Sequence, residues 1–183
     1  MVGGAHTAFM FTTDDKLQAY DYTGSGYAYN IVTTRLFRDT AAWYHIVLAI
    51  DTTQSTSTDR VKLYINGELQ TALDTTTYPS QNYETYVNTA SLAHQIGHSN
   101  TDSFDGYLTD VHFIDGQALA PTDFGEFDDN NVWQAMEFTG TYDTDRTIPS
   151  YPAVTISPSA IGGGNVTHVN GGGTYFYSHA STG

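Results

Sequence analysis

Carboxylates that could work as a catalytic pair are few in this sequence, and none has the required spacing. A retaining glycosidase holds two carboxylates about 5–5.5 Å apart, which on a strand requires near neighbours on one face. The glutamates share no predicted strand; they are Glu68, Glu84, Glu126 and Glu137. Asp110 and His112 are the nearest substitute, and we interpret them as ordinary polar strand positions. A serine nucleophile elbow, a P-loop and a dinucleotide-binding fingerprint are also missing, so we predict that the protein is not an enzyme.

Aromatic side chains in a long polar segment could bind sugars. Residues 74–91 are rich in Thr, Tyr, Ser and Asn and contain Pro79, so we predict a long loop with at most a short edge strand. Exposed tyrosine rings stack on sugar faces, and the candidate glycan-binding residues in this loop are Tyr78, Tyr83 and Tyr86. The alternative is that tyrosine serves here as a strand and interface residue.

Loop carboxylates and amides are the candidate metal ligands. Calcium takes six to eight oxygen ligands, and oxygens could come from Asp102, Asp105, Asp128 and Asn130, with Asp129 and Asn131 beside the last two. No loop contains a complete site. The seven histidines fit no zinc spacing, and there is no cysteine. We therefore expect no cofactor, with calcium as the one ion to consider.

The charge balance excludes some classes of partner. Six basic residues stand against 20 acidic ones, for a net charge of -14. Phosphate binding needs clustered Lys and Arg, and an anionic membrane surface also attracts basic segments. We expect no nucleic acid as a partner and no membrane insertion, because no apolar run approaches a membrane span. The acidity favours solubility, and no signal peptide is visible at Met1.

Alternating side chains predict an all-β domain. Abundant Thr and Tyr with few charged residues is a β-rich composition. The predicted strands are 8–11, 17–22, 27–36, 43–51, 61–66, 68–73, 94–97 and 107–114. Asn66-Gly67 predicts a type I′ hairpin, and Asp115-Gly116 predicts a tight turn. The segment 43–51 is apolar on both faces, which predicts a strand in the middle of a packed sheet.

Several of these segments carry a family resemblance. The stretch FDGYLTDVHFIDGQAL, residues 104–119, resembles the closing strand of laminin G-like, concanavalin A-like domains. WYHIVLAID, VKLYINGEL and HQIG are similar to other strands of that family. The continuation to FGEFD, with Trp133 and Phe138-Thr139-Gly140-Thr141-Tyr142, resembles the version found in tailed-phage virion and tail-fibre proteins. The resemblance covers roughly residues 8–142 and implies a jelly-roll β-sandwich and a virion or extracellular location.

Two family strands that usually come first are not recognisable before Ala8. We expect residues 1–142 to form a jelly roll that enters the fold about two strands late. The alternative is that these strands have drifted in sequence and that Met1 to Phe11 supplies one of them. A sandwich without these strands exposes an edge that another strand can pair with.

Residues 143–183 follow the resemblance and are rich in Gly and Pro, with strand-like pieces between. A flexible tail is one interpretation. The other is a β-rich arm that docks in its own chain or in the next subunit. The predicted assembly residues are Val154, Ile156, Val166, Val169, Tyr175, Phe176 and Tyr177. Head-to-tail docking would give a homo-oligomer that extends into a helical filament.

Two functions are consistent with the predicted sandwich and its C-terminal arm. The first is a non-catalytic structural subunit of a phage particle or extracellular fibre, which self-assembles by exchanging its C-terminal arm. The second is a carbohydrate-binding module that recognises a host or another surface.

Overall fold

The computed structural model describes residues 4–87, 89, 93–99 and 102–142. The chain divides into two compact units, Met1–Leu92 with Ala118–Gly140, and Ala93–Gln117 with Thr141–Gly183. We call the first the sandwich unit and the second the short-strand unit. The described residues contain strands and two short 3-10 turns, η1 (Ser57–Asp59) and η2 (Pro121–Asp123), but no α-helix. Accordingly, no helix in this part of the chain has the length and apolarity to cross a membrane.

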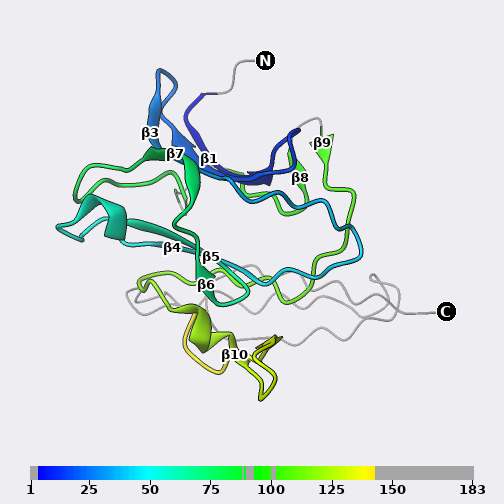
Figure 1. The fold of residues 1–183 in the computed structure, drawn as a ribbon. Coiled ribbons are helices and arrows are strands. Elements are labelled where there is room, and N and C mark those ends of the chain that lie inside the picture. The colour runs from blue at the N-terminus through cyan, green and yellow to red at the C-terminus, as the bar shows by residue number, and fades with distance from the viewer. Residues whose placement is uncertain (1–3, 88, 90–92, 100–101, 143–183) are drawn as a thin grey trace, which may run out of the picture. The chain divides into compact units, whose positions relative to one another are not determined.

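The larger sheet of the sandwich unit, sheet A, has four antiparallel strands (Figure 1). Its strands, in spatial order, are β1 (His6–Phe11), β2 (Leu17–Tyr22), β3 (Tyr27–Thr33) and β7 (Leu73–Thr77). The predicted strand 17–22 is confirmed to the residue, and β7 is the short edge strand that the sequence allowed. The turn before β2 is closed by Asp15, whose φ is 63°.

The second sheet, sheet B, contains β4 (Ile46–Ile50), β5 (Val61–Ile65) and β6 (Glu68–Leu69). Asn66 and Gly67 join β5 to β6 with φ values of 49° and 80°, which confirms the predicted type I′ turn. The prediction that β4 lies inside its sheet is wrong for the described residues. It pairs with β5 on one side and forms an edge of the described sheet.

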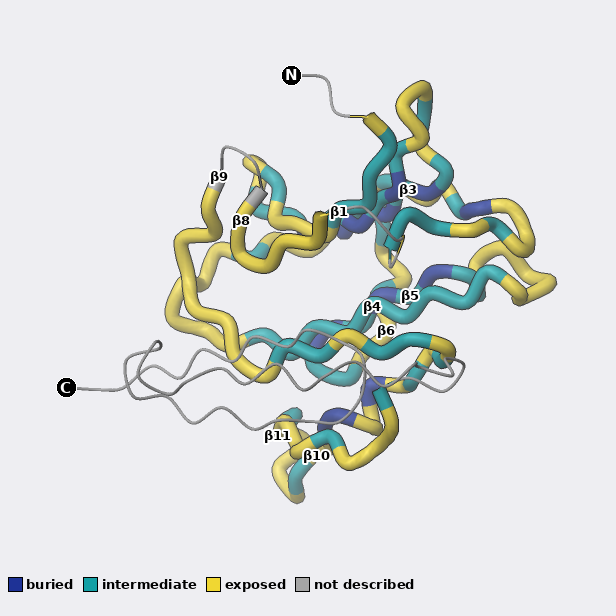
Figure 2. The backbone as a smooth tube through the Cα atoms, turned by 180° about the vertical axis from the view of Figure 1, so that it is seen from behind, coloured by how far each residue is buried: buried dark blue, intermediate teal, exposed yellow. Residues whose placement is uncertain are grey.

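The two sheets pack face to face, and strand alternation decides which side chains lie between them. Burial alternates along β2 and β5, and along β3 after Tyr27, and Figure 2 shows the buried positions on β3 and β5 in dark blue. One core cluster joins Ala19, Tyr29 and Ile31 of sheet A to Val61 of sheet B. A second cluster contains Leu17, Leu63 and Ile65. The sandwich unit is therefore an all-β sandwich with a core of alternate strand residues.

Residues 118–140 complete the sandwich unit with a short hairpin of β10 (Gly125–Phe127) and β11 (Trp133–Ala135). Trp133 from β11 contacts the rings of His45 and Phe127, with centroids 5.5 and 5.0 Å away. The Trp133 indole also fills the space beside two glycines, Gly67 and Gly125, where a Cβ would overlap it. The hairpin is therefore fastened to the β5–β6 turn by one tryptophan.

The short-strand unit contains β8 (His98–Ser99) and β9 (Asp102–Ser103), which pair with each other. The predicted strand at 94–97 is wrong: Gly97 has a φ of 71°, and the strand begins after it. The predicted closing strand at 107–114 is also wrong. Asp110 has a φ of 49°, a left-handed conformation that interrupts an extended segment. The turn at Gly116 is confirmed by its φ of 79°.

Candidate functional site

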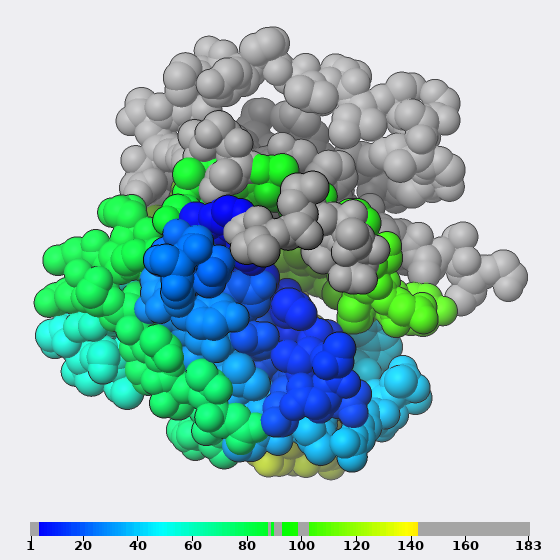
Figure 3. All heavy atoms as spheres, turned by 90° about the horizontal axis from the view of Figure 1, so that it is seen from above, coloured from blue at the N-terminus to red at the C-terminus, as the bar shows by residue number. Residues whose placement is uncertain are grey.

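The side of sheet A that faces away from sheet B is a patterned surface of the sandwich unit. Strand register places on it the side chains opposite in phase to the buried ones. We define this outer face as His6, Ala8, Met10, Gln18, Tyr20, Tyr22, Tyr27, Ala28, Asn30, Val32, Thr75 and Thr77. Figure 3 shows the strands side by side, with β1 to β3 in blue and β7 in green. None of the twelve residues is Asp, Glu, Lys or Arg.

Four aromatic rings gather at one end of the outer face, and we call them the aromatic quartet: His6, Tyr20, Tyr22 and Tyr27. His6 lies 5.5 Å from Tyr20 and 5.8 Å from Tyr22, between ring centroids. Tyr27 lies 5.4 Å from Tyr20 and 5.5 Å from Tyr22. A nitrogen of the His6 ring is hydrogen-bonded to the Tyr20 hydroxyl at 3.1 Å. The rings hold one another in mostly edge-on contacts, which fixes their positions.

A shift in strand register brings Tyr27 into the quartet. Simple alternation predicts Tyr27 on the same side as Tyr29, and that prediction is wrong for the Tyr27 ring. The pairing of β2 with β3 is irregular between Asp21 and Tyr22, so Tyr22 is opposite Tyr27. Such irregularities re-aim side chains locally. Tyr27 is 50% exposed, and it offers the most accessible ring surface of the quartet's tyrosines.

An amide pair lies beside the quartet. Gln18 Nε2 donates a hydrogen bond of 2.8 Å to Asn30 Oδ1 across β2 and β3. Asn30 is directly opposite Tyr20, so the amide pair and the aromatic quartet are contiguous. Burial, and then the neighbouring Tyr27, raises the pKa of the Tyr20 phenol. The Tyr20 phenol and the two neighbouring amides are therefore uncharged at neutral pH.

The buried side of the same sheet holds a carboxylate, Asp21, which is fully buried. The Thr7 hydroxyl donates to it at 2.7 Å, and the backbone N–H of Tyr86 donates at 3.2 Å. Burial, followed by the Asp21 charge and a hydrogen bond to that carboxylate, raises the pKa of the Tyr83 phenol to about 12. Asp21 thus anchors the loop that contains two of the predicted sugar-binding tyrosines.

The predicted glycan-binding tyrosines are half-buried in this loop. Tyr78 packs against the core cluster that contains Tyr29 and Ile31. Tyr83 and Tyr86 are brought together above Asp21. The loop is also tied to the other sheet, because Arg60 donates to the Pro79 carbonyl at 2.8 Å. Glycan binding by the loop tyrosines remains a prediction from sequence.

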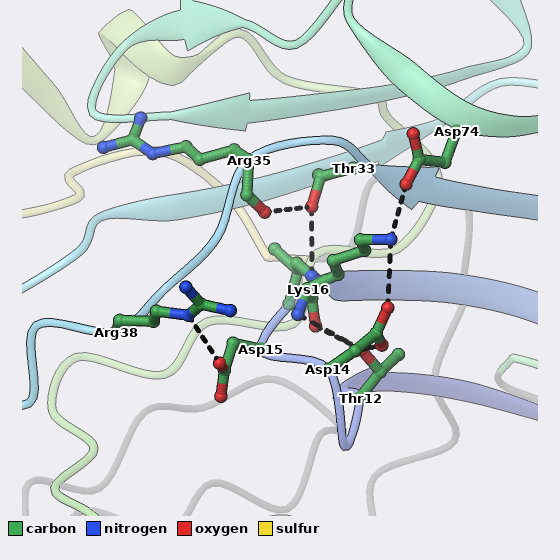
Figure 4. Close-up of polar contacts among 9 residues, drawn as sticks. Thr12, Asp14, Asp15, Lys16, Thr33, Arg35, Arg38 and Asp74 are labelled. Atoms are coloured by element: carbon green, nitrogen blue, oxygen red, sulfur yellow. Dashed lines mark hydrogen bonds and ion pairs between the residues drawn. The ribbon is translucent and has the colours of Figure 1, made fainter.

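Charged side chains of sheet A gather at its turn end instead of on the outer face (Figure 4). Lys16 lies between Asp14 and Asp74, at 2.9 and 2.6 Å, and these contacts raise its pKa. Arg38 pairs with Asp15 at 2.8 Å. The Arg35 guanidinium points away from these carboxylates in Figure 4 and lies over the rings of Phe37 and Tyr44. The ion pairs fasten β7 and the segment after β3 to the first turn.

The predicted calcium ligands do not converge within either unit. Asp128 accepts hydrogen bonds from the backbone N–H groups of Asn130 and Val132, both at 2.9 Å, and these bonds lower its pKa. Asp105 and Asp102 belong to the short-strand unit. No group of three or more His, Asp or Glu suited to a metal occurs among the residues that the structure describes. Calcium binding stays a prediction from sequence.

His112 contacts Tyr142, a partner that the sequence did not indicate. A nitrogen of the His112 ring is hydrogen-bonded to the Tyr142 hydroxyl at 3.0 Å, and the two rings stack. Burial lowers the pKa of His112, and the nearby Asp110 charge partly offsets that effect. The backbone N–H of Asp115 also donates to the Tyr142 carbonyl. These contacts join Tyr142 to the segment 112–115 within the short-strand unit.

One family model matches this chain. It is Laminin_G_3, described as the concanavalin A-like lectin/glucanases superfamily, and it matches residues 2–123. The chain belongs to this superfamily. No curated protein and no solved structure matches it. The family and the two packed antiparallel sheets together confirm the expected fold class, a concanavalin A-like β-sandwich.

The sequence predicted the strands that carry the outer face. It did not predict that their outward side chains form a candidate site. Gln18, Tyr20 and Tyr22 alternate with the buried residues of β2, which is a signal visible in the sequence. The predicted assembly arm, residues 143–183, lies outside the described residues. Its seven predicted assembly residues are outside them as well: Val154, Ile156, Val166, Val169, Tyr175, Phe176 and Tyr177.

Proposed function

We propose that the protein is a carbohydrate-binding module and that the outer face of sheet A is its binding surface. The observation that carries this proposal is the aromatic quartet beside the Gln18–Asn30 amide pair. Aromatic rings stack on the apolar faces of sugars, and a few placed amides bind the hydroxyls and fix orientation. The lectins in the superfamily's description support the same function.

The outer face is suited to binding without reaction. It carries no carboxylate, so it lacks the pair of carboxylates that glycoside cleavage usually requires. The buried Asp21 faces the opposite side of the sheet. We therefore retain the proposal that the protein is not an enzyme. Incubation with a bound oligosaccharide, followed by chromatography, should return the oligosaccharide intact.

Glycan binding is tested with an oligosaccharide array and then by calorimetry on the hits. Tyr27→Ala and Tyr22→Ala should each weaken binding about tenfold, which corresponds to about 1.4 kcal/mol. Tyr107→Ala is the matched control, because Tyr107 is an exposed tyrosine (79%) of the short-strand unit. Binding that depends on Tyr107 as much as on Tyr27 would contradict the placement of the glycan site on the outer face. An array without hits would contradict the carbohydrate-binding function.

The second candidate function is a self-assembling structural subunit of a phage particle or extracellular fibre. The observation that favours it is β4, a strand of five uncharged apolar residues at an edge of the described sheet B. Exposed strand edges accept strands from other segments or other chains. Electron microscopy of the full chain beside a chain ending at Tyr142 tests this candidate. Filaments formed by the full chain alone would assign assembly to residues 143–183, and discrete particles from both chains would reject it.

A further inference from the structure

The amide pair on the outer face has hydrogen-bonding capacity left over. Gln18 Nε2 uses one N–H to reach Asn30 Oδ1. A primary amide has two N–H donors and one carbonyl acceptor. The Asn30 Nδ2 group and the Gln18 carbonyl have no acceptor or donor among the described residues. The pair therefore presents two donors from Asn30, and one donor and the carbonyl acceptor from Gln18, and their mutual hydrogen bond restrains both side chains.

The position of this pair suits a sugar that lies across the strands. Asn30 is opposite Tyr20 of the aromatic quartet on one side and opposite Thr77 of β7 on the other. A pyranose ring placed on Tyr27 or Tyr22 would thus bring the next sugar unit toward the amides. Sugar hydroxyls both donate and accept, so they match a surface that offers donors and acceptors together.

Charge decides which class of sugar fits. The outer face contains no Lys or Arg, so a sugar carboxylate would have no cation to pair with there. Lys16 is engaged by two carboxylates at the turn end. Burying an unpaired charge is costly, and the chain's net charge of -14 adds a repulsive field. A neutral sugar avoids both the cost of burying an unpaired charge and the repulsion by the negatively charged chain.

We infer that the ligand of the outer face is a neutral glycan whose hydroxyls are bound by Gln18 and Asn30 while its rings stack on Tyr22 and Tyr27. This inference rests on the proposed carbohydrate-binding function and adds the class of sugar. It also assigns the two amides as specificity-determining residues.

The test compares neutral and acidic oligosaccharides of equal length. The probes are gluco-, manno-, galacto- and xylohexaose against hexamers of galacturonate and mannuronate, titrated by calorimetry at one salt concentration. The diagnostic variant is Asn30→Asp, which keeps the acceptor for Gln18 but replaces the free N–H donors with a carboxylate oxygen. Asn82→Asp makes the same chemical change at an exposed turn position, where the φ of 58° suits aspartate as well as asparagine, and it is the matched control. Gln18→Leu removes the other amide without adding charge.

At least one neutral hexamer should bind, and the acidic hexamers should bind at least tenfold more weakly. Asn30→Asp and Gln18→Leu should each weaken neutral binding about tenfold, while Asn82→Asp leaves it unchanged. Thermal melting of each variant shows whether the sandwich is folded. Preferred binding of a uronate hexamer, or wild-type affinity in folded Asn30→Asp, overturns the inference and leaves the carbohydrate-binding function standing. Failure of every hexamer, together with an oligosaccharide array without hits, overturns both.

Discussion

The indole of Trp133 occupies the space where Gly67 would carry a Cβ. Gly67 also has a φ of 80°, because it is the second residue of the type I′ turn between β5 and β6. Two independent requirements therefore exclude a side chain at this position. The contact joins the β10–β11 hairpin, which follows the residues matched by the family model, to sheet B.

Gly67→Ala should lower the free energy of unfolding by about 2–4 kcal/mol, through backbone strain and displacement of Trp133. Urea denaturation followed by tryptophan fluorescence measures this change. Gly26→Ala is the control, since a Cβ at Gly26 would meet nothing within 4 Å. Equal stability of the Gly67 and Gly26 variants would show that the Trp133 contact is wrong.

Asp21→Ala should destabilise the sandwich by about 2–4 kcal/mol, because it leaves buried donors without their acceptor. The affected donors are the Thr7 hydroxyl, the Tyr86 N–H and the Tyr83 phenol. The loop above Asp21 should open first, which limited proteolysis within residues 80–87 detects. Asp129→Ala, an exposed aspartate, is the control. A loop that stays protected in the Asp21 variant would contradict the anchoring role.

Alkaline pH should weaken the fold over a defined range. The pKa of Tyr83 rises from its usual value near 10 to about 12 in the folded protein, chiefly through burial. The folded state then holds a proton that the unfolded state has lost, so stability is unchanged below about pH 10 and falls toward pH 12. Tyr83→Phe should make this fall shallower. Some slope should remain, since burial also raises the pKa of Tyr29. An identical pH dependence in both proteins would contradict the assignment.

Much of the sandwich could be predicted from local pattern. The alternation in 17–22 identified β2 and its buried face, and Asn66-Gly67 identified a turn whose geometry both residues demand. These features depend on residues close in sequence, so the sequence carries them directly.

The sequence predictions that were wrong depend on contacts distant in sequence or on the conformation of a single residue. The pattern at 107–114 alternates well, yet Asp110 adopts a left-handed conformation that no alternation rule detects. The apolar faces of 46–50 predict an interior strand, but its position depends on which segment pairs with its second edge. Tyr27 joins the quartet through a register shift that arises between two strands. The outer face could therefore be recognised as a site only once the pairing of β1, β2, β3 and β7 was known.

The central claim is that the outer face of sheet A binds glycans, and nuclear magnetic resonance tests it most directly. The ¹H–¹⁵N spectrum of the full chain is titrated with an oligosaccharide taken from the array. The account predicts that the largest shift changes fall on β2 and β3, at Tyr20, Tyr22, Tyr27 and Asn30, with little change in the 78–86 loop. Changes centred on Tyr78, Tyr83 and Tyr86, or confined to the short-strand unit, would contradict it.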